Sequence, residues 1–124
     1  MERPKPLRGE VWMFDLNPKK GREQKGVRPC LVVSTDALNR SDFGTVIICP
    51  VTTTERPHFR WRVPVATVDL RLADTSWEPK PHWVETDQIV TVDTQHRALR
   101  HLATVVNEDR LRSVDESLRM MLNL

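Results

Sequence analysis

The first strong pattern in the chain is an alternation of apolar and polar positions over residues 10–16. Trp12, Phe14 and Leu16 fall on one side of this segment. An alternation with a period of two is typical of a β-strand with one buried face. An Asn-Pro pair follows directly, and both residue types favour turns. The pattern therefore predicts a first strand that ends in a turn.

Two later segments are apolar without alternation, as expected for strands in the middle of a sheet. They are Pro29–Ser34 and Thr45–Thr52. A proline at the first position of a strand costs little, because its missing N–H falls outside the ladder. Pro50 should cap or bulge the second of these strands near its end. Residues 35–44 contain Asp, Asn, Ser and Gly, which predicts a loop with room for one helical turn.

Weaker strand patterns occupy much of the second half. Strands are expected at Val63–Leu72, at Trp83–Val92 with a break near Asp87-Gln88, and at His101–Val106. A loop with two prolines, Asp74–Pro81, separates the first two. Asp93 is the expected N-cap of a short turn that runs to Leu99.

The last segment has helical spacing. Asn107 can cap a helix over Glu108–Leu122, whose first turn carries two acidic residues suited to the positive end of a helix dipole. Its apolar side chains recur on one face: Leu111, Val114, Leu118, Met121 and Leu122. This stripe predicts packing against a sheet.

Together these elements predict a mostly-β protein of five to seven short strands. We expect a small SH3-like β-barrel with a C-terminal α-helix and one or two short helices. At 124 residues the chain is long enough for one domain, 1–124, with a modest core. Residues 1–7 hold two prolines and three charges, which predicts a loose N-terminal arm.

The composition bears on location, membrane contact and metal binding. No apolar run approaches the roughly 18 residues of a membrane span, and no charged-then-apolar signal sequence opens the chain. We therefore expect no membrane partner and a cytoplasmic location. Cys30 and Cys49 fall inside expected strands, where a buried thiol behaves as a small apolar side chain. No set of metal ligands has recognisable spacing, so we expect no metal site.

The net charge of +2 conceals an asymmetry between the two halves of the chain. Residues 1–62 hold 12 Lys/Arg and 7 Asp/Glu, whereas residues 63–124 hold 7 and 10. A basic half on a nearly neutral domain indicates a local anionic partner, either phosphate or an acidic protein.

Two basic segments account for this asymmetry. Lys19–Lys25 has four cations and one acid, and Arg28 follows it just before Pro29, at the mouth of a strand. The loop alone could equally be a solvated hairpin tip. In Glu55–Arg62, arginines and a histidine are interleaved with two aromatic residues. Cations bind phosphate and aromatic faces stack on unpaired bases. Alternation would instead place these aromatic rings in the core and Arg60 and Arg62 in solvent, and the two interpretations are compatible.

Five short motifs stand in order near the start of the chain. They are RGEVW at 8–12, DLNP at 15–18, GREQ at 21–24, GVRP at 26–29 and LVVS at 31–34. Together they resemble the opening of the MazF/PemK (Kid) toxins, and ICPVTT at 48–53 resembles the second signature of that family. Weaker similarity runs from DQIVTVD at 87–93 to the C-terminal helix, so the resemblance covers nearly the whole chain.

The resemblance implies a barrel of the CcdB/PemK type and the toxin half of a type II toxin–antitoxin system. It also implies a metal-independent, sequence-selective endoribonuclease that needs no cofactor. In such an enzyme the 2′-hydroxyl of single-stranded RNA attacks the adjacent phosphorus, leaving a 2′,3′-cyclic phosphate and a 5′-hydroxyl. Cleavage would inhibit translation and growth.

Catalytic roles follow from the same resemblance. The key arginine of the family falls on Arg28 and its key threonine on Thr52. A guanidinium stays protonated at neutral pH, so Arg28 is a phosphate clamp rather than a base. Thr52 can donate a hydroxyl hydrogen bond to the same oxygens. Glu23 matches the family's Gly-x-Glu-Gln stretch and is a candidate for the base. A histidine has an unperturbed pKa nearer neutral pH, but His58 has no motif support.

RNA-binding residues are expected in both basic segments. They are Lys19, Lys20, Arg22, Gln24, Lys25, Thr53, Arg56, His58 and Arg60. The remaining histidines, His82, His96 and His101, have no motif support.

Two other functional classes stay open. A non-catalytic gyrase poison like CcdB would share the fold, but such relatives lack the Arg-Pro and Thr-Thr blocks and end in Trp-Gly-Ile, which this chain does not. A plain SH3-like nucleic-acid-binding module would bind RNA without cutting it.

The resemblance also implies a homodimer with RNA across the subunit interface. An acidic, partly disordered MazE-like antitoxin would cover the same groove.

Overall fold

The computed structural model describes residues 4–18, 20–23 and 26–124. Within these residues the strands are β1 (Glu10–Asp15), β2 (Val27–Val32), β3 (Thr45–Thr52), β4 (Val63–Val65), β5 (Leu70–Leu72), β6 (His82–Val84), β7 (Val90–Asp93) and β8 (Ala98–Val105). The helices are α1 (Asp36–Asn39), α2 (Thr94–Arg97), α3 (Glu108–Leu122) and the 3₁₀ turns η1 (Thr67–Asp69) and η2 (Thr86–Gln88). The expectation of a mostly-β fold with a C-terminal helix is confirmed.

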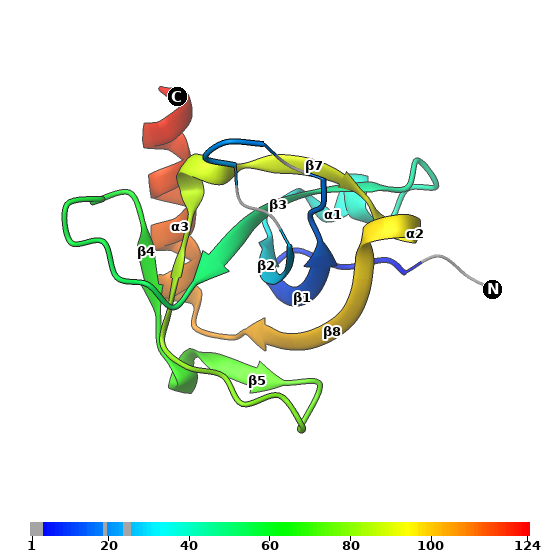
Figure 1. Ribbon diagram of the computed structural model, residues 1–124, viewed down its shortest axis with the longest axis horizontal. Helices are drawn as coiled ribbons and strands as arrows, with labels where there is room; N and C mark the ends of the chain where they lie inside the picture. Colours follow the sequence, from blue (N-terminus) through cyan, green and yellow to red (C-terminus); the bar gives the residue numbers. More distant parts are fainter. Residues whose placement is uncertain (1–3, 19, 24–25) are drawn as a thin grey trace.

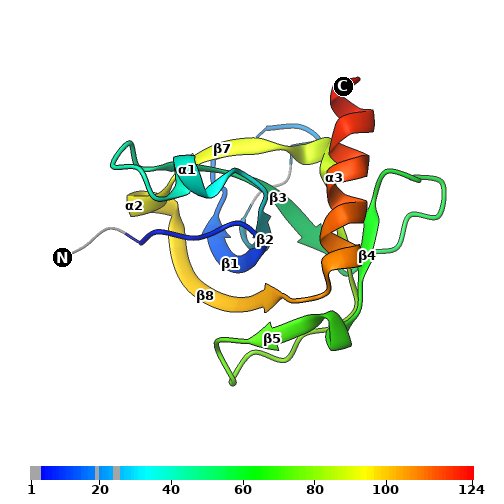
Figure 2. The same ribbon diagram turned by 180° about the vertical axis from the view of Figure 1, so that it is seen from behind.

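All strands join one antiparallel sheet in the order β4-β6-β3-β2-β1-β8-β5, and β7 pairs with β3 off this path. The sheet curls into a half-barrel, with β8 sweeping around one side and α3 standing against another (Figure 1). Seen from behind, α3 lies beside β4 (Figure 2), and α3 also contacts η2. No helix among the described residues is long and apolar enough to cross a lipid bilayer.

One feature of β3 shapes the molecule. The first half of β3 pairs with β7, and its last two residues pair with β6. The segment that runs from β6 to β7 therefore lies along β3, but its pairing with β3 is interrupted between the two ladders. The interruption is η2, and it falls beside Pro50, whose carbonyl accepts a hydrogen bond from Glu85 N at 2.9 Å. Proline has no N–H to donate to this neighbour. The ladder is therefore free to open there, which confirms the expected break near Asp87-Gln88. The expected cap or bulge of β3 at Pro50 is wrong, because β3 keeps a regular register with β2 through Pro50 and continues to Thr52.

The curled sheet buries apolar side chains on both faces. The inner cluster comprises Phe14, Leu16, Cys30, Val32, Val46, Ile48, Val92 and Ala98. The outer cluster comprises Val11, Leu31, Cys49, Val51, Val63, Val65, Val84, Leu102, Val105 and Val114. Because successive side chains of a strand point to opposite faces, each central strand contributes to both clusters.

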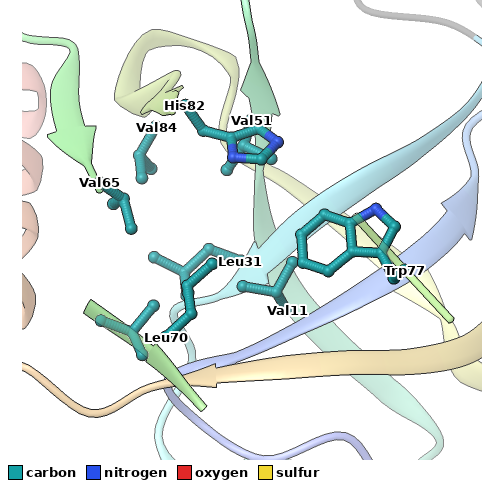
Figure 3. Close-up of a pocket in the computed structure, with 9 residues that line it drawn as sticks. Val11, Leu31, Val51, Val65, Leu70, Trp77, His82 and Val84 are labelled. Carbon is teal, nitrogen blue, oxygen red and sulfur yellow. The ribbon is translucent and has the colours of Figure 1, made fainter. Parts of the chain in front are cut away.

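A small apolar cavity lies within the outer cluster. Figure 3 shows Val11, Leu31 and Val51 pointing into it, with the rings of Trp77 and His82 among its lining. The two rings stack with centroids 5.7 Å apart. His82 is 7% exposed, and burial lowers the pKa of its imidazole below the ordinary value. The cavity is part of the core.

Helix α3 begins and ends where the sequence predicts. The side chain of Asn107 accepts hydrogen bonds from Asp109 N and Arg110 N, and Asn123 takes a left-handed conformation with φ 57° after the last turn. The expected apolar stripe is only partly right. Leu122 is 56% exposed, whereas Ser117, a polar residue, is buried. The hydroxyl of Ser117 donates to the carbonyl of Trp61, which accounts for its burial.

The expected single strand over residues 63–72 is wrong. It divides into β4, η1 and β5, because the carboxylate of Asp69 is buried and accepts a hydrogen bond from Ala66 N at 2.8 Å. Asn107 Nδ2 donates to the same carboxylate at 2.8 Å. These bonds turn the chain, so the described residues form eight strands rather than the expected five to seven.

The described part of the N-terminal arm, residues 4–7, lies against the barrel. Pro6 is fully buried, and Lys5 Nζ donates to the Arg40 carbonyl at 3.2 Å and contacts Asp42 at 3.3 Å.

Candidate functional site

The candidate site begins where β2 and β3 reach the same end of the half-barrel. Cys30 pairs with Pro50 in an antiparallel register. Continuing that register by two residues places Arg28 opposite Thr52. Alternation gives both side chains the face of the inner cluster. The structure thus brings together the arginine and threonine that were expected to be catalytic.

The hydroxyl of Thr52 has a defined orientation. Its oxygen accepts a hydrogen bond from the backbone N–H of Thr54 at 3.1 Å. Because the oxygen acts as the acceptor there, the hydroxyl hydrogen stays available for a ligand. A fixed donor beside a guanidinium suits an anionic oxygen such as that of a phosphate.

A groove with a volume of about 560 Å³ adjoins this pair. Its walls come from the β1–β2 loop, the β3–β4 loop and η2. The lining residues are Arg22, Arg28, Thr52, Thr54, Arg56, Phe59, Arg62, Asp87 and Gln88. Four arginines face one carboxylate in this lining. The groove therefore has the charge expected of a site for a polyanion.

The arginines of the groove are not equivalent. Arg22 and Arg56 are exposed and form no ion pair with any residue in the described ranges. Arg62 is 9% exposed at its side chain and is paired with Glu85 at 3.0 Å and Asp87 at 3.4 Å. The expectation that Arg62 lies in solvent is therefore wrong.

The backbone explains this difference. Residues 55–62 do not alternate as a strand but form turns, in which Phe59 N donates to Arg56 O at 2.8 Å and Arg62 N donates to Phe59 O at 3.1 Å. These turns direct the side chain of Arg62 inward. Phe59 stacks on Trp61 with centroids 4.9 Å apart and also lines the groove, so its ring serves both packing and the site.

Two carboxylates border the groove in different ways. Asp87 lines it together with Arg28 and Thr52. Glu23 lines an adjoining hollow that shares Asp87 and Gln88 with the groove. Lys20 N donates to Glu23 Oε1 at 3.2 Å, within the turn of the β1–β2 loop. The expected base thus lies beside the groove, and Asp87 is the carboxylate within it.

The other expected RNA contacts are scattered. Arg22 and Arg56 line the groove, whereas Arg60 lines a separate hollow against α3. Lys20, Thr53 and His58 are exposed and are not among the groove-lining residues. Lys19, Gln24 and Lys25 lie outside the described residues.

Sequence reasoning did not assign Asp87, Gln88 or Arg62 to the site. A signal for the first two was present, because a polar pair interrupts an otherwise apolar strand pattern at that point. No comparable signal marked Arg62, since its inward direction depends on turns that bring distant segments together.

The two cysteines are not candidates for the chemistry. Both are fully buried and free of disulfides, as expected for small apolar side chains. Burial raises the pKa of the Cys49 thiol to about 12 and raises the pKa of the Cys30 thiol still further. Both therefore stay protonated and unreactive at neutral pH.

Comparison with known proteins places this geometry in a family. The profile of the PemK-like, MazF-like toxins of type II toxin–antitoxin systems matches residues 7–122. A curated relative, endoribonuclease MazF9 of Mycobacterium tuberculosis, is 31% identical over 121 residues, which cover 94% of this chain and 96% of the relative. The chain belongs to this family of toxins. The expectation of an endoribonuclease, rather than a gyrase poison or a plain binding module, is confirmed.

Solved structures agree with the fold. The crystal structure of MazF from Deinococcus radiodurans superposes with a TM-score of 0.74 at 25% identity, covering 98% of this chain and 99% of that one. A mycobacterial endoribonuclease in complex with its cognate antitoxin gives a TM-score of 0.69 at 25% identity, covering 97% and 95% of the two chains. The half-barrel with its C-terminal helix is therefore the fold of MazF toxins.

Proposed function

We propose that the groove binds single-stranded RNA and cleaves it without a metal, through attack of a 2′-hydroxyl on the adjacent phosphorus. The products are a 2′,3′-cyclic phosphate and a 5′-hydroxyl. The observation that carries this proposal is the placement of Arg28 opposite Thr52 at a groove whose lining also carries the exposed Arg22 and Arg56. The nucleophile belongs to the substrate, so the protein has to bind the phosphate and move two protons.

Each of the two paired residues has a distinct part. Arg28 holds the scissile phosphate and stabilises the charge that builds on its oxygens in the transition state. The Thr52 hydroxyl donates to the same oxygens, since its acceptor side is already occupied by Thr54 N. The ring of Phe59 offers a face on which an unpaired base can stack.

The proton of the 2′-hydroxyl goes to one of two carboxylates, Asp87 in the groove or Glu23 beside it. Comparing Asp87→Asn with Glu23→Gln decides between them. The variant that lacks the base should lose about 10²-fold or more in rate, within the range that general base catalysis supplies. The other variant should change the rate far less.

The first experiment incubates a long unstructured RNA with purified protein in EDTA and maps the fragment ends. We expect cuts at a short recurring sequence, with cyclic-phosphate ends. Arg28→Ala should lower the rate by about 10²–10³-fold. Arg71→Ala is the matched control, because Arg71 is an exposed arginine of the edge strand β5, outside the groove lining. Intact RNA with folded wild-type protein, or cleavage that needs a divalent ion, would contradict the proposal.

We propose further that an acidic antitoxin covers the same groove and thereby blocks RNA. Support comes from the cationic lining and from relatives of the same fold that were solved with their antitoxins. Both ligands are extended anions and would compete for the same arginines. Adding a cognate antitoxin should displace a fluorescent RNA. Formation of a ternary complex with undiminished RNA affinity would rule out a shared site.

A homodimer in the cytoplasm completes the proposal. Large apolar side chains are exposed near the end of α3, with Met120 at 55%, Leu122 at 56% and Leu124 at 87%. Burial of such side chains between two copies would stabilise a dimer. Light scattering after size exclusion at micromolar concentration should give twice the mass of the chain, and a monomer at all concentrations would contradict it.

A further inference from the structure

The guanidinium of Arg62 contacts two carboxylates and one aromatic ring at the wall of the groove. Its Nη2 lies 3.0 Å from Glu85 Oε2, and its Nε lies 3.4 Å from Asp87 Oδ1. Its Cζ lies 4.8 Å from the centroid of the Phe59 ring. The Arg62 side chain is only 9% exposed and that of Glu85 is fully buried, while Asp87 is 24% exposed. One cation thus joins a buried carboxylate to a carboxylate that faces the groove.

This arrangement excludes Arg62 as a phosphate ligand. Its single positive charge is balanced by two negative charges within 3.5 Å. A phosphate approaching the same guanidinium would meet both carboxylates. Arg56, in contrast, is exposed and forms no ion pair with a described residue. Two arginines of the same loop therefore have different tasks.

The neighbouring residue ties the same loop end to the rest of the fold. The carbonyl of Trp61 accepts hydrogen bonds from the hydroxyls of Thr86, at 2.7 Å, and Ser117. Thr86 belongs to η2 and Ser117 to α3. Residues 61 and 62 together attach the end of the β3–β4 loop to the turn that carries Asp87.

We propose that Arg62 is a positioning residue, which holds the Asp87 carboxylate and the Phe59 ring in the orientation that RNA cleavage requires. This inference rests on the proposed function of the groove. Arg62 acts through Asp87 and Phe59 and does not touch the RNA. Its loss should lower kcat through Asp87 and raise KM by no more than about twofold, because the arginines that bind the phosphate chain stay in place and only the stacking of one base on Phe59 is loosened.

A purely structural role is the alternative, in which Arg62 only neutralises buried Glu85. The single variant Arg62→Met does not separate the two, since an uncompensated buried carboxylate is strongly destabilising. The double variant Arg62→Met/Glu85→Gln removes both charges and keeps similar side-chain volumes. It should fold, because it leaves no uncompensated charge at the buried position 85.

The test compares the wild type and this double variant in steady-state cleavage of a short fluorogenic RNA. We expect a native circular dichroism spectrum, a kcat at least about tenfold lower and a KM within about twofold of wild type, as for loss of a contact that acts only in the transition state. Arg110→Met/Asp69→Asn is the matched control, because it removes another ion pair with a buried carboxylate, of length 3.3 Å, outside the groove. It should keep the wild-type kcat. A double variant of residues 62 and 85 with wild-type kcat, or with a raised KM at unchanged kcat, would overturn the proposal.

Hydrogen exchange provides a readout that does not depend on cleavage. The amides of Phe59, Arg62 and Gln88 are hydrogen-bonded within the loop and η2. Their exchange should be at least about tenfold faster in the double variant than in wild type, since the segment opens locally more often. If the wild type cuts no RNA, the proposed function fails, and faster exchange at these amides still supports positioning by Arg62. Unchanged exchange would overturn it in either case.

Discussion

The apolar cavity and the arginine-lined groove are built from the same two strands. Leu31 of β2 and Val51 of β3 line the cavity, while Arg28 and Thr52 of these strands line the groove. Val51 and Thr52 are consecutive and face opposite sides of the sheet. One pair of strands thus lines an apolar cavity on one face and, at its end, the candidate groove on the other, so substitutions at these two places should have separable effects.

The largest expected effect lies on the cavity side. Leu31→Ala should lower the free energy of unfolding by about 2–5 kcal/mol, because it enlarges a cavity in a fully buried position. Urea denaturation measures this loss. Cleavage per folded molecule, assayed at low temperature, should stay close to wild type. A stable Leu31→Ala protein with a much reduced rate would break the separation of the two faces.

The next largest effects should come from two single substitutions, in which Thr52 is replaced by valine or Val51 by threonine. Thr52→Val removes the donor in the groove and should reduce the cleavage rate by about 10²-fold with little change in stability. Val51→Thr places a hydroxyl in the apolar cavity and should cost about 1–3 kcal/mol of stability without changing the rate of the folded protein. Paired thermal melts and single-turnover assays check both. Equal rate losses in the two variants would show that the faces are coupled.

Substitution of Arg56 should have a smaller effect, which is limited to RNA binding in the groove. Arg56→Gln should raise KM several-fold at low salt and leave kcat unchanged, because an exposed cation contributes to phosphate binding. The salt dependence of RNA affinity should become shallower by about 0.7 in a logarithmic plot, the value for one phosphate contact to a single strand. A fall in kcat with unchanged KM would instead give Arg56 a role like that of Arg62.

The smallest expected effect concerns His82 in the cavity. Burial lowers the pKa of His82 in the folded protein below its ordinary value of 6.5, so the unfolded chain takes up a proton first as the pH falls. The contribution of this residue to stability is complete above pH 6.5 and declines as the pH falls below it. His82→Phe keeps a ring against Trp77 and should flatten this part of the stability profile, measured by urea denaturation between about pH 7.5 and 5.5. An unchanged stability profile would show that His82 does not contribute to the pH dependence of stability.

Much of the fold follows from local sequence patterns. The boundaries of β3 and α3 and the caps at Asp93 and Asn107 were predictable, because alternation, apolar runs and capping residues act over a few neighbours. The division of residues 63–72 was not predictable, since the buried carboxylate of Asp69 depends on Asn107, which is distant in the sequence.

Some residues of the candidate site were likewise predictable from the sequence and others were not. Arg28 and Thr52 were predictable because they lie in short motifs at strand ends, and the register of β2 and β3 brings them together. The place of Arg62 was hidden in the sequence, where it is one of three arginines in a basic loop. Only the tertiary contacts with Glu85 and Asp87 distinguish it from the exposed Arg56 and from Arg60.

The missing N–H of Pro50 has a consequence for how such a site can diversify. Because the ladder beside β3 is interrupted there, the three residues of η2 do not follow the alternation that the sheet imposes elsewhere: Thr86 bonds inward to Trp61, whereas Asp87 and Gln88 line the groove. Substitution of Gln88 should therefore alter the shape of the groove wall without shifting the register of the barrel. A single backbone atom gives the recognition surface a freedom to vary that the framework beneath it lacks.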